Sequence, residues 1–221
     1  MGLDMFMNRT KKIDDMTLEE ILMTAEYVNF LNRPEKYKSS TFETWYNGDM
    51  SKVREDKIDK VIANIHTCYS SWDTEKEYGY TDVSDGVAYW RKANAIHNWI
   101  IENCADGVDE CQIIELTKEN LESLLDAAKT VKKNSKLVNG TVNNGYTFEN
   151  GKEVPYIQEG KVIEDPSVAI ELLPTTSGFF FGSTDYDEWY LEDIKSTIEQ
   201  ITKILKTTDF DTEYVSYHAS W

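Results

Sequence analysis

The stretch that decides the fold class is Leu3-Asp4-Met5-Phe6-Met7, in which apolar and polar residues alternate loosely at the start of the chain. Such alternation is typical of a β-strand with one buried face. The last residues, Tyr214-Val215-Ser216-Tyr217-His218-Ala219-Ser220-Trp221, predict a second strand. We therefore expect both ends of the chain to be integral to one sheet.

Between these strands, apolar residues recur at helical spacing in several segments, each preceded by a capping residue. Thr17 with Glu20 three residues later has the pattern of a capping box, and Thr184 is the expected cap of the last long helix. Apolar runs over 111–116 and 178–182 predict two further strands. The helices are expected over residues 18–33, 51–66, 86–104, 118–131, 167–173 and 185–207.

Strands that alternate with helices in this order predict an α+β fold. We expect a small, mostly antiparallel sheet that includes both terminal strands, packed with about four to five helices. Residues 134–165 differ in character, because they are rich in Asn, Gly, Val and Tyr and contain three Asn-Gly pairs. Asn150-Gly151 lies between two apolar runs, as in a β-hairpin. The expected organisation is a single domain over 1–221 with a β-hairpin arm inserted at about 134–165.

Composition excludes several classes of protein. The formal net charge is −17, from 23 basic and 40 acidic residues. A generic nucleic-acid binder needs a basic surface, and anionic membranes repel an acidic one, so neither partner is expected. Three cysteines (Cys68, Cys104 and Cys111) without a CxxC pair or a signal peptide indicate free thiols and a cytoplasmic location, which is the host cytoplasm for a phage-encoded chain.

The negative charge is concentrated in two segments, 102–126 and 181–221, which together carry thirteen of the seventeen net charges. One interpretation is a solvated surface that keeps the protein soluble. A second is a face that docks on a basic protein groove by imitating nucleic-acid phosphates, and a third is a divalent-cation site. The candidate partner-binding residues are Asp106, Asp109, Glu110, Glu115, Asp185, Asp187, Glu188, Glu192 and Asp193.

The densest group of chemically versatile side chains is Tyr89-Trp90-Arg91-Lys92-Ala93-Asn94-Ala95-Ile96-His97. On the expected helix, Trp90, Asn94 and His97 share one face, where they could stack on a ring and hydrogen-bond its edge. This predicts a pocket for a nucleotide-like ligand. The alternative is a core helix whose Asn and His bond to loop backbone. The candidate pocket residues are Trp90, Arg91, Asn94, His97, Ser183 and Thr184.

No catalytic motif accompanies these groups. The patterns GxSxG, GxxxxGK[ST] and GxGxxG do not occur, so no catalytic residue, cofactor or metal ligand is assigned. His66, His97 and His218 are far apart in the sequence, which leaves a Cys–His or His–Asp pair open. The glycines around 178–182 suggest an anion site before a helix, but Asp185, Asp187 and Glu188 there would repel phosphate.

Four blocks of the chain resemble a family of small proteins from phages, prophages and bacteria. They are Gly2-Leu3-Asp4-Met5, the 89–97 block, Gly178-Phe179-Phe180-Phe181-Gly182 with Thr184-Asp185-Tyr186-Asp187, and the final Ser220-Trp221. The resemblance implies an origin and a context rather than a reaction, since small acidic phage proteins are often antagonists of host systems.

Three functions follow as hypotheses. The first is a stoichiometric inhibitor of a host nucleic-acid-handling or defence complex of the CRISPR type, bound through the acidic face. The second is a binder of, or an enzyme acting on, a nucleotide-like ligand. The third is a structural or accessory protein. The target and the oligomeric state are not determined by the sequence.

Overall fold

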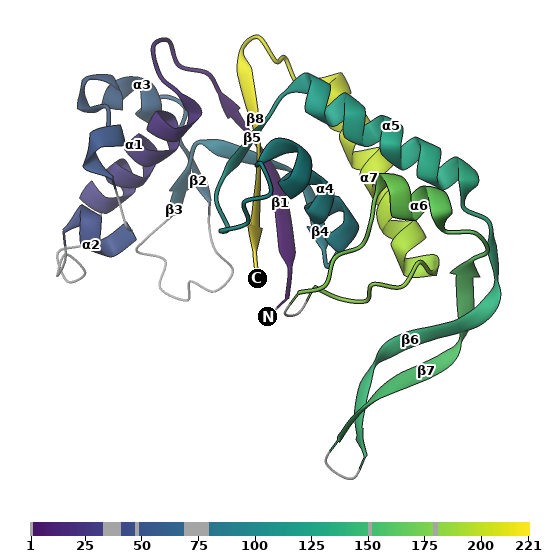
Figure 1. Ribbon diagram of the computed structural model, residues 1–221. Coiled ribbons are helices and arrows are strands. Elements are labelled where there is room, and N and C mark those ends of the chain that lie inside the picture. The colour runs from purple at the N-terminus through teal and green to yellow at the C-terminus, as the bar shows by residue number, and fades with distance from the viewer. Residues whose placement is uncertain (1, 33–40, 47–48, 69–79, 150–151, 179–180) are drawn as a thin grey trace. The chain divides into compact units, whose positions relative to one another are not determined.

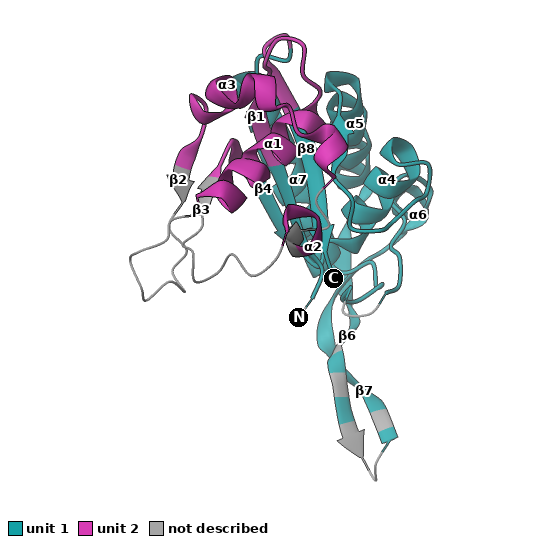
Figure 2. Ribbon diagram, turned by 90° about the vertical axis from the view of Figure 1, so that its left-hand side faces the viewer, with its two compact units in different colours: residues 1–7, 86–210, 215–221 teal, residues 8–85, 211–214 magenta. Residues whose placement is uncertain are grey.

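The computed structural model describes residues 2–32, 41–46, 49–68, 80–149, 152–178 and 181–221. The chain divides into two compact units (Figure 2). Unit 1 comprises residues 1–7, 86–210 and 215–221, and unit 2 comprises residues 8–85 and 211–214. The sequence predicts one domain, whereas each of these units has a hydrophobic cluster of its own.

A four-stranded sheet has the strand order β4-β1-β8-β5. Its strands are β1 (Asp4–Lys11), β4 (Ser84–Arg91), β5 (Ile114–Leu116) and β8 (Glu213–Ser220) (Figure 1). Strand β5 pairs antiparallel with β8. The amide of Lys92, just after β4, donates to the carbonyl of Leu3, just before β1, so that pair is antiparallel too. The predicted α+β fold, with both terminal strands in one mostly antiparallel sheet, is confirmed.

The helix expected over 86–104 is wrong in its first half. Residues 84–91 form β4, and helix α4 (Asn94–Cys104) begins only after a break. Lys92 adopts a left-handed conformation, with φ of 61°, which a continuous helix does not allow. Within β4, Trp90 is buried and Arg91 is exposed, as alternation in a strand requires.

The strand expected over 178–182 is wrong for the residues that the structure describes there. Gly178, Phe181 and Gly182 have no regular secondary structure, while Phe179 and Phe180 lie outside the described residues. Gly182 has φ of 95°, which favours glycine and does not continue a strand. The fourth strand of the sheet is β4, at one edge, rather than residues 178–182.

Unit 1 buries one face of its strand segments under helices. The other helices of this unit are α5 (Lys118–Asn134), α6 (Ser167–Leu172) and α7 (Glu188–Thr207). Alternate residues from Leu3 to Met7 and from Val215 to Ala219 enter the core, where they pack with apolar residues of α4, α5 and α7. They are Leu3 just before β1, Met5 and Met7 of β1, and Val215, Tyr217 and Ala219 of β8. Helix α5 begins after Thr117, which forms a capping box with Asn120.

Unit 2 is built around helix α1 (Leu18–Leu31), whose predicted capping box of Thr17 and Glu20 is present. The helix expected over 51–66 is wrong: short 3₁₀ turns at Met50–Lys52 and Glu55–Lys57 precede a five-residue α3 (Ile58–Ile62). The unit also contains α2 (Phe42–Tyr46), β2 (His66–Cys68) and β3 (Tyr80–Asp82). Its core consists of Ile13, Met16, Ile21, Ala25, Val61 and Val83.

The predicted hairpin arm is present in unit 1 as β6 (Leu137–Glu149) paired with β7 (Lys152–Ile163) (Figure 1). The expected turn Asn150-Gly151 lies outside the described residues. Gly140 faces Gly160 across the pair, and a Cβ on either would come within 2.7 Å of a valine methyl of the opposite strand. Among the described side chains of the arm, Ile163 and the partly buried Leu137, both at its base, pack in the unit 1 core.

None of the helices in the described part of the chain combines the length and the apolar character needed to cross a membrane.

The outer part of the arm should be dispensable for folding. We expect a chain in which an Asn-Gly turn replaces residues 143–157 to lose less than about 1 kcal/mol of unfolding free energy, because removing a solvated loop costs little. Urea denaturation measures this. As a control, Ile163→Ala removes a buried side chain at the base and should cost about 2–5 kcal/mol. A shortened chain that no longer unfolds cooperatively would contradict this account of the arm.

Candidate functional site

A cavity of about 350 Å³ lies within unit 1, and we call it the unit 1 cavity. Its walls come from α4, the loop that follows α4, the irregular segment before α7, and the residue after β8. The lining residues are His97, Asn98, Ile101, Glu102, Gly107, Asp109, Thr176, Ser177, Gly178, Phe181 and Trp221. These segments are distant in sequence, so the fold alone assembles the cavity.

His97 is buried at the base of this cavity, with 1% of its surface exposed. Its Nδ1 lies 2.8 Å from the hydroxyl of Tyr217, and its Nε2 lies 3.0 Å from Oδ2 of Asp109. Burial holds the pKa of Tyr217 well above its usual range, so the hydroxyl stays protonated and forms a neutral hydrogen bond with Nδ1. Nε2–H then donates to the carboxylate, which satisfies both ring nitrogens.

The bond chain continues to the last residue of the sequence. Asp109 also accepts a hydrogen bond from the indole Nε1 of Trp221, at 3.4 Å. Phe181 packs edge-on against both the imidazole of His97 and the indole of Trp221. The His–Asp pair that the sequence left open is therefore His97 with Asp109. Both nitrogens of the imidazole are already engaged, so its role here is to hold β8, α4 and the loop together.

Asn94 anchors the segment that forms the opposite wall. Its Nδ2 donates to the carbonyls of Phe181 and Ser183, at 3.2 and 2.8 Å, and its Oδ1 accepts from the amide of Thr176. One buried amide thus fixes the main chain on both sides of Gly178. This function is structural, because all the partners are backbone groups.

The pocket predicted from the 89–97 block is wrong as a single helix face. Trp90 is in β4, where it is buried and donates from Nε1 to the hydroxyl of Thr197 at 3.0 Å. Arg91, Ser183 and Thr184 are exposed and do not line the cavity. Of the six predicted residues, His97 lines the cavity and Asn94 supports its wall.

The nine predicted acidic residues fall into two groups. Five are exposed: Asp106, Glu110, Glu115, Asp185 and Glu192. Asp109 is half-buried against His97, and Glu188 accepts a hydrogen bond from the amide of Lys161. The acidic face of nine residues stays a prediction, although Asp109 and Glu188 already have partners within the fold.

Asp187 is the buried N-cap of α7, a role the sequence assigned to Thr184. Its carboxylate accepts from the amides of Trp189 and Tyr190, at 2.9 and 3.0 Å. Burial raises its pKa, and these two bonds oppose that shift. Since a buried cap cannot contact a partner, Asp187 is not part of a docking face.

Asp193 is half-buried and lies nearly two turns after Asp187 along α7. Burial raises its pKa to about 7, and the nearby carboxylates of Asp187 and Glu192 add to the shift. The folded state therefore holds a proton on Asp193 that the unfolded chain has released above about pH 4. The free energy of unfolding falls as pH rises from about 4 to about 7, because the charged form is disfavoured in the fold.

Asp193→Asn should remove this pH dependence. We expect the variant to be more stable than the wild type by about 1–3 kcal/mol at pH 8 and to differ little at pH 5, because the amide is neutral throughout. Urea denaturation at the two pH values measures the difference. Glu192→Gln, at an exposed neighbour, should leave the wild-type slope in place. Equal stabilisation of the Asn variant at both pH values would contradict the assignment.

The bond chain around His97 should dominate the stability of unit 1. His97→Ala leaves a cavity and removes the hydrogen-bond partner of the Tyr217 hydroxyl. It should therefore lower the free energy of unfolding by about 3–5 kcal/mol. Tyr217→Phe removes one hydrogen bond and should cost about 1–2 kcal/mol. Chemical denaturation followed by tryptophan fluorescence measures both losses. His66→Ala, at an exposed histidine, should change stability by less than about 0.5 kcal/mol. A loss at His97 as small as that would show that the bonds do not stabilise the fold.

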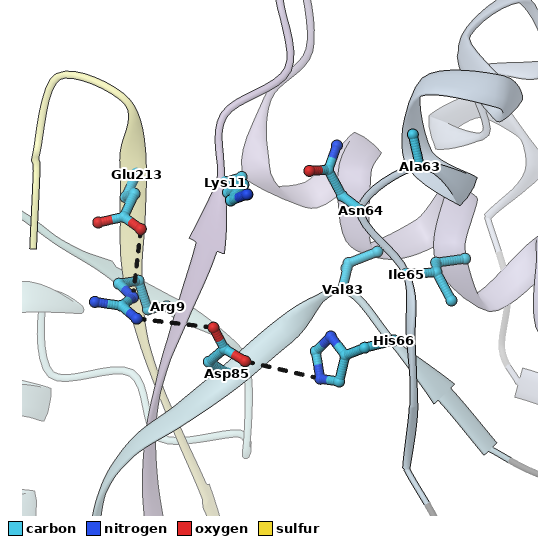
Figure 3. Close-up of a pocket in the computed structure, with 9 residues that line it drawn as sticks. All are labelled: Arg9, Lys11, Ala63, Asn64, Ile65, His66, Val83, Asp85 and Glu213. Carbon is cyan, nitrogen blue, oxygen red and sulfur yellow. Dashed lines mark ion pairs between the residues drawn. The ribbon is translucent and has the colours of Figure 1, made fainter.

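A second cavity, of about 250 Å³, lies within unit 2 (Figure 3). Arg9 points between two carboxylates, 3.4 Å from Glu213 and 3.7 Å from Asp85, and His66 points toward Asp85 at 3.9 Å. No sequence motif indicated these residues, because they come from four separate segments. Their charges alternate and pair with one another, which is sufficient to explain their placement.

Neither metal nor thiol chemistry gains support from the described residues. Within them, no three His, Cys, Asp or Glu side chains come together as metal ligands would. Cys104 and Cys111 are free thiols, and burial raises the pKa of Cys104 to about 11, which disfavours the reactive thiolate. The side chain of Cys68 lies outside the described part of the chain.

Comparisons with known proteins give no match to any family model, to any curated protein or to any solved structure.

Proposed function

We propose that this protein is a stoichiometric binding protein that docks on a basic, nucleic-acid-binding surface of another protein. In the setting that the phage resemblance implies, the partner is a host nucleic-acid-handling or defence complex, and docking inhibits it. The docking surface is the acidic segment, residues 102–126.

The observation that carries the proposal is the exposure of this acidic segment. Seven of its eight carboxylates are exposed, and Asp109 is the exception. Lys118 is the only basic residue of the segment, and it already pairs with Glu122 at 3.7 Å. The exposed carboxylates are Glu102, Asp106, Glu110, Glu115, Glu119, Glu122 and Asp126.

These carboxylates belong to elements that contact one another. Helix α4 contacts both β5 and α5, and β5 is the edge strand of the sheet. A run of like charges on adjoining elements is unfavourable for the isolated fold, since it adds self-repulsion. Lysine and arginine side chains of a partner would relieve the repulsion, and complementary charge would also speed association.

The second acidic segment supports the proposal less. Asp187 is a buried cap, Asp193 titrates near neutral pH, and Glu192 pairs with Lys195 at 3.2 Å. The nucleotide-ligand hypothesis is weaker still, because Trp90 and Arg91 lie away from the unit 1 cavity. The geometry therefore favours residues 102–126 as the contact surface.

Charge reversal in the acidic segment tests the proposal. The variant carries Glu110→Lys, Glu115→Lys and Asp126→Lys, at three exposed positions that should tolerate substitution. The bait is the immobilised protein, and the prey is the fraction of a bacterial lysate that binds heparin. We expect the wild type to capture proteins that competing duplex DNA releases, and the variant to capture at least about tenfold less.

The matched control carries Glu171→Lys, Glu192→Lys and Glu199→Lys, which change the net charge equally at exposed positions outside the segment. Its capture should stay within about twofold of the wild type, and wild-type capture should weaken as salt shortens the screening length below about 10 Å. The proposal is contradicted if duplex DNA does not release the captured proteins, or if both triple variants lose capture equally. The acidic segment would then be only a solvated surface.

A further inference from the structure

We propose that the unit 1 cavity receives a guanidinium group, presented by an arginine side chain of the basic partner. This inference rests on the proposed function and names the chemical group that the protein recognises there.

Two aromatic side chains, Trp221 and Phe181, form part of the cavity wall. In Trp221, 49% of the surface is exposed, against 7% in Phe181. The two rings meet edge to face, with centroids 5.8 Å apart and planes at 69°. The hydrogen bond from Nε1 of Trp221 to Asp109 fixes the orientation of the indole. A fixed, half-exposed indole face is a favourable surface for a guanidinium, which stacks on it and is attracted by its quadrupole.

The lining of the cavity is negatively charged. Glu102 and Asp109 are its two carboxylates, and Asp109 is engaged by His97 and Trp221. Glu102 is exposed and forms no ion pair with any residue that the structure describes. Its carboxylate lies beside Gly107, where an added Cβ would be 3.7 Å from Oε1. A carboxylate in the same cavity as an indole can accept two parallel N–H bonds from a guanidinium that enters it.

The lining of the cavity disfavours phosphate and neutral rings as ligands. Among the described residues that line the cavity there is no lysine or arginine, and both nitrogens of His97 are already bonded. A phosphate would therefore meet carboxylates without a compensating cation. A neutral ring could contact Trp221 but would leave Glu102 unpaired. The cavity, at about 350 Å³, has room for a guanidinium with its methylene stem.

The test is a titration of the full-length protein with N-acetyl-arginine amide, followed by the ¹H–¹⁵N signal of the Trp221 indole. That signal is assigned by its loss in Trp221→Phe. We expect a saturable shift, and at least about fivefold weaker binding to Glu102→Gln, because one charge-assisted pair is lost. Glu171→Gln, an exposed carboxylate on α6, should bind as the wild type does. N-acetyl-citrulline amide, which has the same shape without the charge, should bind at least about tenfold more weakly.

The proposal is overturned if capped arginine gives no saturable shift, or if capped citrulline binds equally well. It is also overturned if free arginine binds more tightly than the capped form, since that would identify a free amino acid rather than a side chain as the ligand. The titration uses the isolated protein, so a charge-dependent shift supports the site even where the capture assay fails. Conversely, capture that DNA competes, together with no shift, would overturn this inference and leave the proposed function standing.

Discussion

The unit 1 cavity depends on the two hydrogen bonds that the buried imidazole of His97 forms with Tyr217 and Asp109. A buried histidine needs partners for both ring nitrogens, and here they are Tyr217 of β8 and Asp109 of the loop after α4. This requirement couples the positions of strand, helix and loop. Trp221 donates a hydrogen bond to the same carboxylate of Asp109. The positions of the indole and of this carboxylate in the cavity wall therefore both depend on His97.

The large negative charge has two physically different parts. Some carboxylates act within the fold: Asp187 caps α7, Asp109 orients His97, and Asp193 is held partly protonated by burial. Among the exposed carboxylates of residues 102–126, Glu122 pairs with Lys118 and Glu119 is hydrogen-bonded in the first turn of α5, while the other five form no ion pair with the described residues. A count of charges from the sequence treats both parts alike. The distinction matters for function, because only charge that remains in solvent can attract a partner.

The two cavities show the same contrast on a smaller scale. In unit 2, Arg9 lies between Asp85 and Glu213, so opposite charges compensate one another within the cavity. In unit 1, Glu102 lines the same cavity as the half-exposed Trp221, with no cation in the described lining. An uncompensated carboxylate at an aromatic surface favours a cationic ligand, whereas a compensated network is stable as it stands.

The sequence by itself determined the features that depend on residues close together in the chain. The capping box of Thr17 and Glu20, the start of α5 after Thr117, and the hairpin of β6 and β7 depend on residues close together in the chain, and all were predictable. The alternation at the two termini also predicted their strands.

Only the tertiary structure decided the rest. Residues 86–91 have apolar spacing that suits either a helix or a strand, and pairing with β1 selected the strand. The separation of Trp90 from His97 follows from that pairing, while α7 starts after Asp187 rather than Thr184 because the buried Asp187 carboxylate caps it. Glu102, Phe181 and Trp221 meet through long-range packing, and a local pattern carries no information about partners that lie 40 to 120 residues away.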